Sequence, residues 1–185
     1  LENFCINSNA NVTIEEEKDS FIGNPTECAL LVAARKAGWD YADKREKADV
    51  AHIFTFSSQK KDMSTILRTE DGYMLYVKGN PEKIMALSGN LTEEEKKKLE
   101  EKITFFQSRA GRILAFAHKK LAQYTGEETQ VELETDLTYD GFVVISDPLS
   151  PDVYGAIGRC RKAGIEVKML TGDNILTARA IADEL

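Results

Sequence analysis

The chain has 185 residues, 42% of them hydrophobic and 30% charged, which is the composition of an ordinary soluble globular protein. Its formal net charge of −7 argues against a nucleic-acid partner, since a phosphate backbone needs a basic face. No run approaches the roughly 18 apolar residues of a membrane-spanning helix, and no basic region precedes an apolar run at the N-terminus, so neither a membrane span nor a signal peptide is predicted.

The cysteines and histidines form no metal-binding pattern. The three cysteines lie far apart without CxxC spacing, and neither of the two histidines has another histidine or a cysteine nearby. Sparse cysteines of odd number are typical of reduced thiols in a cytosolic protein. The sequence therefore predicts no structural zinc site. Because the first residue is not Met, we expect a piece of a longer protein.

The first predicted helix covers residues 24–37, "NPTECALLVAARKA". Asn24 suits the N-cap and Pro25 the first helical position, while Glu27 falls at the third position, as in a capping box. Alanines and leucines recur at helical spacing, and Gly38 is a suitable stop. The sequence thus predicts a helix that carries Glu27 in its first turn.

Three strand-like segments follow. Residues 50–58, 62–69 and 73–79 are rich in β-branched and aromatic residues, and Asp71-Gly72 is typical of a hairpin turn between the last two. The sequence therefore predicts antiparallel pairing here.

A Gly-Asn-Pro tripeptide occurs twice, at Gly23 and at Gly79. After the second, Asn80 can cap a short helix that ends at Gly89. We interpret both tripeptides as a turn, a cap and a helix start, and not as a repeat or a phosphate loop. We expect substitution of the two asparagines to reduce stability, and substitution of Glu27 or Lys78 to reduce ligand binding alone.

A longer helix is predicted over residues 91–111, where Thr92 and Glu95 form a capping box. Residues 112–121, "RILAFAHKKL", are an apolar run typical of a strand. The polar residues 122–136 have the composition of an exposed connection.

From residue 139 the pattern changes. Residues 140–147 and 165–173 are continuous apolar runs typical of strands buried on both faces, and each precedes a predicted helix, the first over 150–164. This βαβα order favours a parallel sheet with ligand loops at the carboxyl ends of its strands. The predicted fold is therefore α+β: an antiparallel sheet flanked by helices over residues 1–138, then a partial parallel βαβα segment over 139–185.

Polar residues follow both predicted parallel strands. Asp147 ends the first, and Thr171, Gly172 and Asp173 follow the second. Carboxylates and a hydroxyl at such positions suit phosphate or magnesium chemistry, but the same residues are also common loop caps. Spacing alone leaves both interpretations open.

Several residues before position 113 also have two interpretations. Lys61 and Lys78 fit solvated surface lysines, and they fit ammonium groups over nucleotide phosphates beside Phe56 as a stacking surface. Glu27 fits a helix cap, and it fits an acceptor for an amino group such as that of adenine. Arg112 fits a phosphate ligand and equally a cap for the preceding helix.

The sequence lacks GxxxxGK[ST], GxGxxG, HExxH and GxSxG motifs. Six other segments occur in an order that resembles the cytoplasmic portion of P-type cation-transporting ATPases: "NPTECALL", "FSSQKKDMSTIL", "VKGNPEKIM", "GRILAFA", "SDPLSPDV" and "AGIEVKMLTGDN". The calcium-pump branch is the most similar, particularly in "GNPTECALL" and "KKDMSTIL". The resemblance implies a nucleotide-binding domain over 1–138 and part of a haloacid-dehalogenase-like phosphorylation domain over 139–185.

The resemblance also implies roles for individual residues. Glu27 would lie at the adenine pocket, Phe56 would stack on the base, and Lys61 would reach toward the phosphates of ATP. Lys78, followed by Gly79, would line the deep end of the pocket, and Arg112 would bind phosphate. The phosphorylation site, which uses Mg²⁺ in the complete enzyme, would include Asp147, Thr171, Gly172 and Asp173.

The chain departs from the family pattern at two positions. Ser58 stands where an arginine is frequent, and Ser150 where a basic residue is usual, which puts one phosphate contact and one interdomain contact in doubt. The DKTGT and GDGxNDxP motifs do not occur. We therefore expect these residues alone to bind ATP without forming an aspartyl-phosphate.

In the parent protein, an integral membrane ATPase, this portion would lie at the cytoplasmic face, with ATP and the rest of the same polypeptide as partners. Two other classes remain open from the sequence: a soluble phosphatase of the haloacid-dehalogenase superfamily, and a non-catalytic nucleotide-binding module.

Overall fold

A computed structural model describes residues 1–13, 20–109, 111–146, 149–170 and 175–185. The helices are α1 (Glu2–Ile6), α2 (Pro25–Lys36), α3 (Tyr41–Lys47), α4 (Pro81–Leu87), α5 (Glu93–Gln107), α6 (Gln130–Leu133), α7 (Pro151–Lys162) and α8 (Ile175–Glu184). The strands are β1 (Asn11–Thr13), β2 (Ser20–Ile22), β3 (Val50–Phe54), β4 (Asp62–Thr69), β5 (Gly72–Gly79), β6 (Arg112–Leu121) and β7 (Thr138–Ile145). The chain forms two compact units, Leu1–Glu93 with Leu114–Val143, and Glu94–Ile113 with Val144–Leu185.

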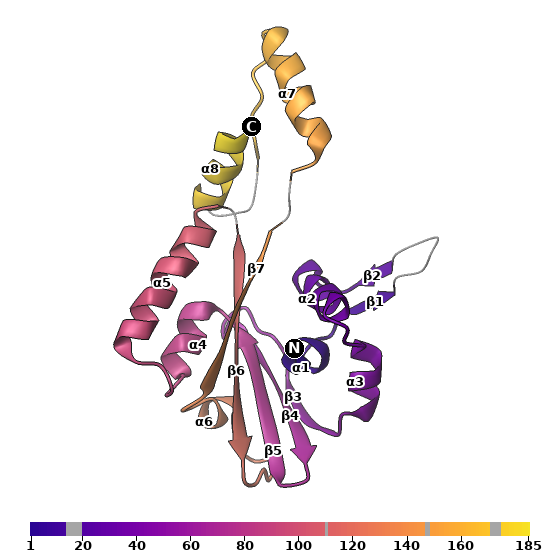
Figure 1. The fold of residues 1–185 in the computed structure, drawn as a ribbon, viewed down its shortest axis with the longest axis vertical. Helices are drawn as coiled ribbons and strands as arrows, with labels where there is room; N and C mark the ends of the chain where they lie inside the picture. Colours follow the sequence, from indigo (N-terminus) through magenta and orange to yellow (C-terminus); the bar gives the residue numbers. More distant parts are fainter. Residues whose placement is uncertain (14–19, 110, 147–148, 171–174) are drawn as a thin grey trace. The chain divides into compact units, whose positions relative to one another are not determined.

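An antiparallel sheet in the order β3-β4-β5-β6-β7 is the centre of the fold, and β1 and β2 form a separate hairpin (Figure 1). The predicted strands at 62–69, 73–79 and 112–121 are confirmed. The chain turns between β4 and β5 where predicted; Gly72, which pairs with Thr69, has φ +130°, a backbone conformation that favours glycine. The α+β antiparallel fold predicted for the first part of the chain is therefore confirmed.

The register of β4 with β5 decides which side chains share a face. Asp62 pairs with Gly79, Met63 with Lys78, and Ile66 with Leu75. Successive side chains along a strand point to opposite faces. Asp62 and Ile66 therefore lie on one face of the sheet, and Met63 and Lys78 lie on the other.

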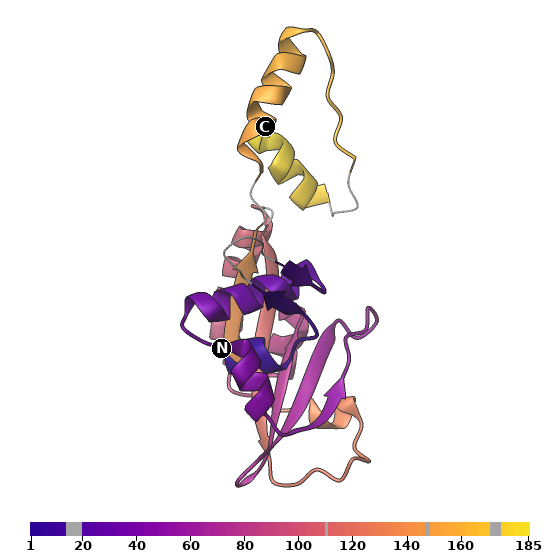
Figure 2. The same ribbon diagram turned by 90° about the vertical axis from the view of Figure 1, so that its right-hand side faces the viewer.

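Different helices cover the two faces (Figures 1 and 2). On the face of Ile66, a core of buried side chains includes Ile84 of α4 and Leu133 of α6. On the other face, Leu67 packs with Cys5 of α1 and with residues of α2 and α3. Each face thus has its own apolar core and its own set of helices.

Two asparagines fix the short helix α1 to the sheet. The Asn3 amide donates to the carbonyl oxygen of Val77 at 3.0 Å, and the Asn7 amide donates to that of Met63 at 3.1 Å. The Thr65 hydroxyl donates to Asn7 Oδ1 at 2.9 Å. These buried polar groups pair with the sheet and with one another, which compensates for their loss of water.

The prediction for residues 122–136 is wrong for 130–134. The segment contains α6, where Gln130, Leu133 and Glu134 are buried. A complete capping box of Thr129 and Glu132 begins this helix. The polar composition indicated an exposed loop. The segment is buried nevertheless, because the side chains of Gln130 and Glu134 are paired with other polar groups.

The predicted parallel segment is not observed. The strand predicted at 140–147 is found as β7, but it lies next to β6 in the antiparallel sheet and is only partly buried. Residues 165–170, predicted as a strand, have no regular secondary structure, and the side chains of Ile165 and Leu170 are exposed. A strand needs hydrogen-bonding neighbours, and no described strand pairs with these residues.

The helices predicted on either side of residues 165–170 are confirmed as α7 and α8. Among the residues that the structure describes, no helix combines the length and the apolar composition needed to cross a membrane.

Candidate functional site

The two Gly-Asn-Pro segments begin helices, as predicted. The Asn24 side chain accepts a hydrogen bond from the backbone N–H of Thr26 at 2.9 Å at the start of α2. The Asn80 side chain accepts one from the backbone N–H of Lys83 at 3.0 Å at the start of α4. A proline occupies the first turn in each case and removes a donor that would have no partner.

The glycines in these segments allow two stretches of backbone to approach closely. A Cβ atom at Gly23 would lie 2.9 Å from Ala10 Cα, and one at Gly79 would lie 2.6 Å from the carbonyl oxygen of Lys61. The same carbonyl accepts a hydrogen bond from the backbone N–H of Asn80 at 3.0 Å. Gly79 therefore lets the segment ending at Lys61 lie against the end of β5.

Glu27 and Lys78 form a buried ion pair between α2 and the end of β5. Their side chains are 15% and 5% exposed, and the Lys78 ammonium contacts Glu27 Oε1. The backbone N–H of Asn9 donates to Glu27 Oε2 at 3.1 Å. Two positions that sequence reasoning placed in one pocket are thus in direct contact.

Burial lowers the pKa of Lys78, since the charged form loses water. The hydrogen bond and the charge of Glu27 oppose this shift, and the Arg45 guanidinium adds to it. The pair is therefore balanced in charge: Glu27 compensates the positive charge that Lys78 brings to the site.

The segment before β4 carries an exposed aromatic ring and an exposed cation. Phe56 is 60% exposed, and Lys61 is exposed with φ +60°, a backbone conformation that is uncommon outside glycine. Within the described part of the chain, the Lys61 side chain makes no hydrogen bond or ion pair. The backbone N–H of Lys61 donates to the carbonyl oxygen of Ser57 at 2.8 Å, which closes the turn. An exposed ring and a free ammonium on one turn are suited to contact a ligand.

The structure thus brings together four of the predicted residues: Glu27 and Lys78 through their side chains, and Lys61 and Gly79 through the backbone. Phe56 lies in the same turn region as Lys61. The other predicted positions divide into two groups. Arg112 begins β6 and belongs to the second compact unit. Asp147, Thr171, Gly172 and Asp173 lie outside the described residues.

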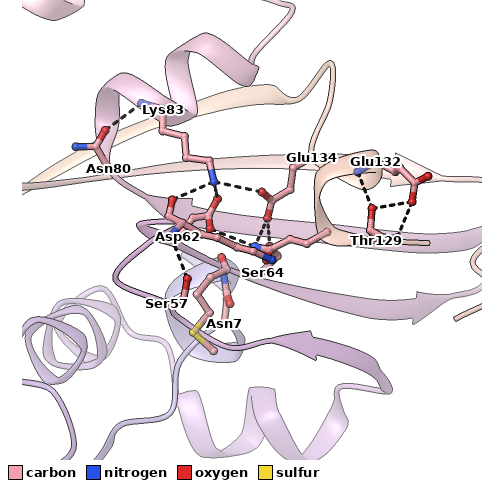
Figure 3. A network of polar contacts seen from close by, with 12 residues as sticks. Asn7, Ser57, Asp62, Ser64, Asn80, Lys83, Thr129, Glu132 and Glu134 are labelled. Carbon is pink, nitrogen blue, oxygen red and sulfur yellow. Dashed lines mark hydrogen bonds and ion pairs between the residues drawn. The ribbon is translucent and has the colours of Figure 1, made fainter. Parts of the chain in front are cut away.

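A second buried polar cluster lies on the opposite face of β4 and was not predicted (Figure 3). We call it the carboxylate network; its members are Asp62, Ser64, Lys83, Gln130 and Glu134. The Lys83 ammonium contacts Asp62 Oδ2 and lies 3.8 Å from Glu134 Oε2. The Gln130 amide donates to Glu134 Oε1 at 2.7 Å and to Asp62 Oδ1 at 3.2 Å.

The carboxylate network holds two acids and one base. Burial raises the pKa of Glu134 to about 7. The hydrogen bonds from Ser64 and Gln130 oppose this shift, and the hydrogen bond and charge of Asp62 add to it. The raised pKa of Glu134 therefore follows first from burial and then from the neighbouring acid.

One sequence signal for the network was available. The segment "TQVE" at Thr129 has the S/T-x-x-E pattern of a helix start, and Gln130 and Glu134 follow at a spacing of four, which places them on one helical face. No local pattern connects them with Asp62 or Lys83, because those residues lie more than 40 positions earlier in the chain.

Comparison with known proteins identifies the family. Residues 1–152 match the family model described as "P-type ATPase, cytoplasmic domain N". The chain belongs to this family. The resemblance of its motifs to P-type ATPases is therefore confirmed.

Individual P-type ATPases match over nearly the whole chain. The chain is 36% identical to "Calcium-transporting ATPase PAT1" of Dictyostelium discoideum, over 98% of the chain and 17% of that protein. It is also 36% identical to "Calcium-transporting ATPase 3, plasma membrane-type" of Oryza sativa subsp. japonica, over 94% and 18%. The identity to "Calcium-transporting ATPase" of Bacillus subtilis is again 36%, over 98% and 21%. The chain thus spans about a fifth of the length of these relatives.

Proposed function

We propose that this chain binds ATP and is the nucleotide-binding portion of a P-type ATPase that transports a cation, with calcium favoured by the names of the relatives. The observation that carries the proposal is the ion pair of Glu27 and Lys78 next to the turn that exposes Phe56 and Lys61. Two segments far apart in sequence supply the groups: α2 supplies an acceptor, Glu27, and the segment before β4 supplies a ring and a cation, Phe56 and Lys61.

Glu27 and Phe56 would hold the base. A carboxylate has roughly four lone-pair positions, and two on Glu27 are used by Lys78 and the backbone N–H of Asn9. Glu27 therefore retains capacity to accept a hydrogen bond from the exocyclic amino group of adenine. The exposed ring of Phe56 offers a stacking surface, worth about 1–3 kcal/mol for a nucleic-acid base.

Lys61 would hold the phosphates, whereas Lys78 would orient Glu27. The ammonium of Lys61 is exposed and free among the described residues, which suits a mobile anionic chain. Lys78 is already compensated by Glu27 and is almost fully buried. We infer that Gly79 is needed because a side chain there would collide with the segment of Lys61. The family resemblance implies that Arg112 would bind phosphate in the whole protein.

In the whole protein, the γ-phosphoryl group would pass from ATP to an aspartate carboxylate elsewhere in the polypeptide, and ADP would leave. Residues 1–138 would hold the nucleotide in a sheet that β7 completes, and the residues after β7 would belong to a haloacid-dehalogenase-like phosphorylation domain, with Asp147, Thr171, Gly172 and Asp173 at its site. Mg²⁺ would neutralise phosphate charge. The carboxylates expected near it, Asp147 and Asp173, lie outside the described residues.

Titration of the 185-residue chain with ATP, adenosine and tripolyphosphate tests the proposal. We expect Phe56→Ala to weaken ATP and adenosine by a similar factor, about tenfold or more, because it removes stacking. Lys61→Ala should weaken ATP several-fold and leave adenosine unchanged. Lys98→Ala, on an exposed helix face, is the control for a lost surface charge.

The proposal fails if millimolar ATP moves none of the amide signals of Glu27, Phe56 and Lys78. It also fails if tripolyphosphate moves the same set as ATP while adenosine moves none, because that result would indicate an anion effect without base recognition. Absence of acid-stable label on the chain after incubation with γ-labelled ATP would agree with the expectation that these residues alone form no aspartyl-phosphate.

A further inference from the structure

Side chains on the face of the sheet opposite the Glu27–Lys78 pair hold the turn that carries Lys61. The Lys83 ammonium donates to the carbonyl oxygen of Lys60 at 3.0 Å, and the Lys60 ammonium donates to Gln130 Oε1 at 2.8 Å. The Asn80 N–H holds the next carbonyl, that of Lys61, at 3.0 Å. The segment 57–61 is thus anchored at two consecutive carbonyls.

Lys83 is held in place for this contact by the carboxylate network. Figure 3 shows its side chain reaching from α4 toward Asp62 and Glu134. Asp62 is fully buried and the Glu134 side chain is 3% exposed, whereas the Lys83 side chain is 31% exposed. Two buried acids therefore hold the Lys83 ammonium, which also donates a hydrogen bond to the backbone of the turn.

The groups around Glu134 come from four elements. Asp62 faces it from β4 and Lys83 from α4. Lys60 reaches the network through Gln130. Lys119 of β6 donates to the carbonyl oxygen of Thr135 at 2.5 Å and lies 3.5 Å from that of Leu133, so its charge lies beside the same backbone. The network is connected to the turn through Lys83 and Lys60. Its two carboxyl groups, those of Asp62 and Glu134, outnumber its one ammonium group, that of Lys83.

We propose that Lys83, Asp62 and Glu134 act as positioning residues that fix the segment 57–61 and thereby set the affinity of Lys61 for nucleotide phosphates. The inference rests on the proposed function, because it assigns this turn to ATP. None of the three residues needs to touch the nucleotide. Their effect passes through the Lys60 carbonyl and the adjoining backbone of Lys61.

The sign of the pH dependence follows from the charges. Below pH about 7, Glu134 retains its proton. Above it, a buried negative charge appears on Glu134, which draws Lys83 toward the carboxylates and away from the Lys60 carbonyl and favours entry of water. The turn should therefore be better ordered, and ATP better bound, on the acidic side of neutral pH.

The experiment measures ATP and adenosine affinity of the 185-residue chain from pH 5.5 to 8.5, together with amide signals of residues 57–61 without nucleotide. We compare the unmodified chain with Glu134→Gln, Lys83→Met and Lys83→Arg. Glu70→Gln and Lys120→Met, at exposed positions, are the matched controls for charge. Because ATP itself titrates in this range, the informative quantity is the affinity of the variant divided by that of the unmodified chain.

We expect Lys83→Met to weaken ATP about fivefold, with less than about twofold change for adenosine, and Lys83→Arg to restore most of the loss. Glu134→Gln should bind ATP like the unmodified chain at pH 5.5 and more tightly at pH 8.5. The signals of 57–61 should titrate near neutral pH in the unmodified chain and not in Glu134→Gln.

Constant affinity ratios with pH, together with unshifted signals of 57–61 in both Glu134→Gln and Lys83→Met, would overturn the inference while leaving ATP binding intact. Failure of the unmodified chain to bind ATP would instead refute the proposed function. The signals of 57–61, measured without nucleotide, still decide whether the network positions the turn. If Lys83→Met does not fold, Lys83→Arg and Glu134→Gln give the same decision.

Discussion

Each face of the β4–β5 hairpin carries one buried group of charged side chains, and the two groups differ in charge balance. On one face, a single carboxylate, Glu27, meets a single ammonium, Lys78. On the other, Asp62 and Glu134 share the ammonium of Lys83. The first group is balanced and the second has an excess acid. Charge balance, more than depth of burial, should therefore decide how each responds to mutation and pH.

The two groups are also neighbours along the strands. Lys78 pairs across the sheet with Met63, and the next residue of β4 toward the N-terminus, Asp62, pairs with Gly79. A shift of one residue exchanges the faces of the sheet. Consecutive positions of the strands thus contribute to the candidate ligand site on one face of the sheet and to the carboxylate network on the other.

The largest expected effect comes from unbalancing the first group. Glu27→Gln leaves the Lys78 charge buried without its partner, and removal of one member of a buried pair costs about 3 kcal/mol or more in free energy of unfolding. Urea denaturation at pH 7 measures it, with the exposed Glu70→Gln as control.

The loss in Glu27→Gln should shrink toward alkaline pH. Burial lowers the pKa of Lys78, and Glu27→Gln removes the charge that opposes this shift, so the pKa in the variant lies further below its usual value of about 10.4. Between the lowered and the usual pKa the unfolded chain binds more protons than the folded chain, so the free energy of unfolding rises with pH more steeply in the variant than in the unmodified chain. A loss below about 1 kcal/mol at pH 7 would show that the pair is solvated and the comparison is false.

The second group should respond in the opposite direction. Because the pKa of Glu134 is raised to about 7, the folded chain binds more protons than the unfolded chain between the usual carboxyl range and pH 7. The free energy of unfolding then falls as pH rises through this window. Glu134→Gln lacks that loss, so relative to the unmodified chain it should gain about 2.5 kcal/mol between pH 5 and pH 8.

Urea titrations at pH 5 and pH 8 measure this gain, and Glu70→Gln again gives the effect of an exposed charge. If Glu134→Gln is destabilised at both pH values by the same amount, Glu134 is an ordinary paired acid, and the two groups do not differ in charge balance.

The two asparagine caps should give equal and smaller effects. Asn24→Ala and Asn80→Ala each remove one side-chain acceptor from a helix start, which costs about 1 kcal/mol. Thermal or urea unfolding measures the loss. An Asn80→Ala loss far above that of Asn24→Ala would show that α4 and its Lys83 depend on the network more than on the cap.

The smallest effect is expected for an exposed ion pair in the same unit. Lys47 and Asp43 of α3 lie at a spacing of four with side chains 72% and 45% exposed. Lys47→Ala should change the free energy of unfolding by about 0.5 kcal/mol or less, and 0.5 M salt should remove the difference. An effect as large as that of Glu27→Gln would show that burial does not decide how much an ion pair contributes to the free energy of unfolding.

The sequence expectation for Glu27 and Lys78 changes with the structure. Sequence reasoning separated caps, which set stability, from site residues, which set binding. The exposures of 15% and 5% and the direct contact mean that substitution of either residue should affect both properties. A separation of site from scaffold is not possible where a candidate ligand residue is itself buried.

Local chemistry determined much of this protein before any tertiary contact was known. Asn-Pro starts helices α2 and α4, and Asp71-Gly72 closes the β4–β5 hairpin, because capping and turn geometry depend on neighbouring residues alone. The ordered motifs also indicated the family. The contact of Glu27 with Lys78 was anticipated only as membership of one pocket.

The tertiary structure decided what depends on partners distant in sequence. β7 joins β6 in an antiparallel sheet although its apolar run looked parallel, since strand pairing depends on the available neighbour. The polar segment with Gln130 and Glu134 is buried because Asp62, Ser64 and Lys83 satisfy it from other elements. Burial of charge is a property of assembled groups, and only the assembled fold shows which acids outnumber which base.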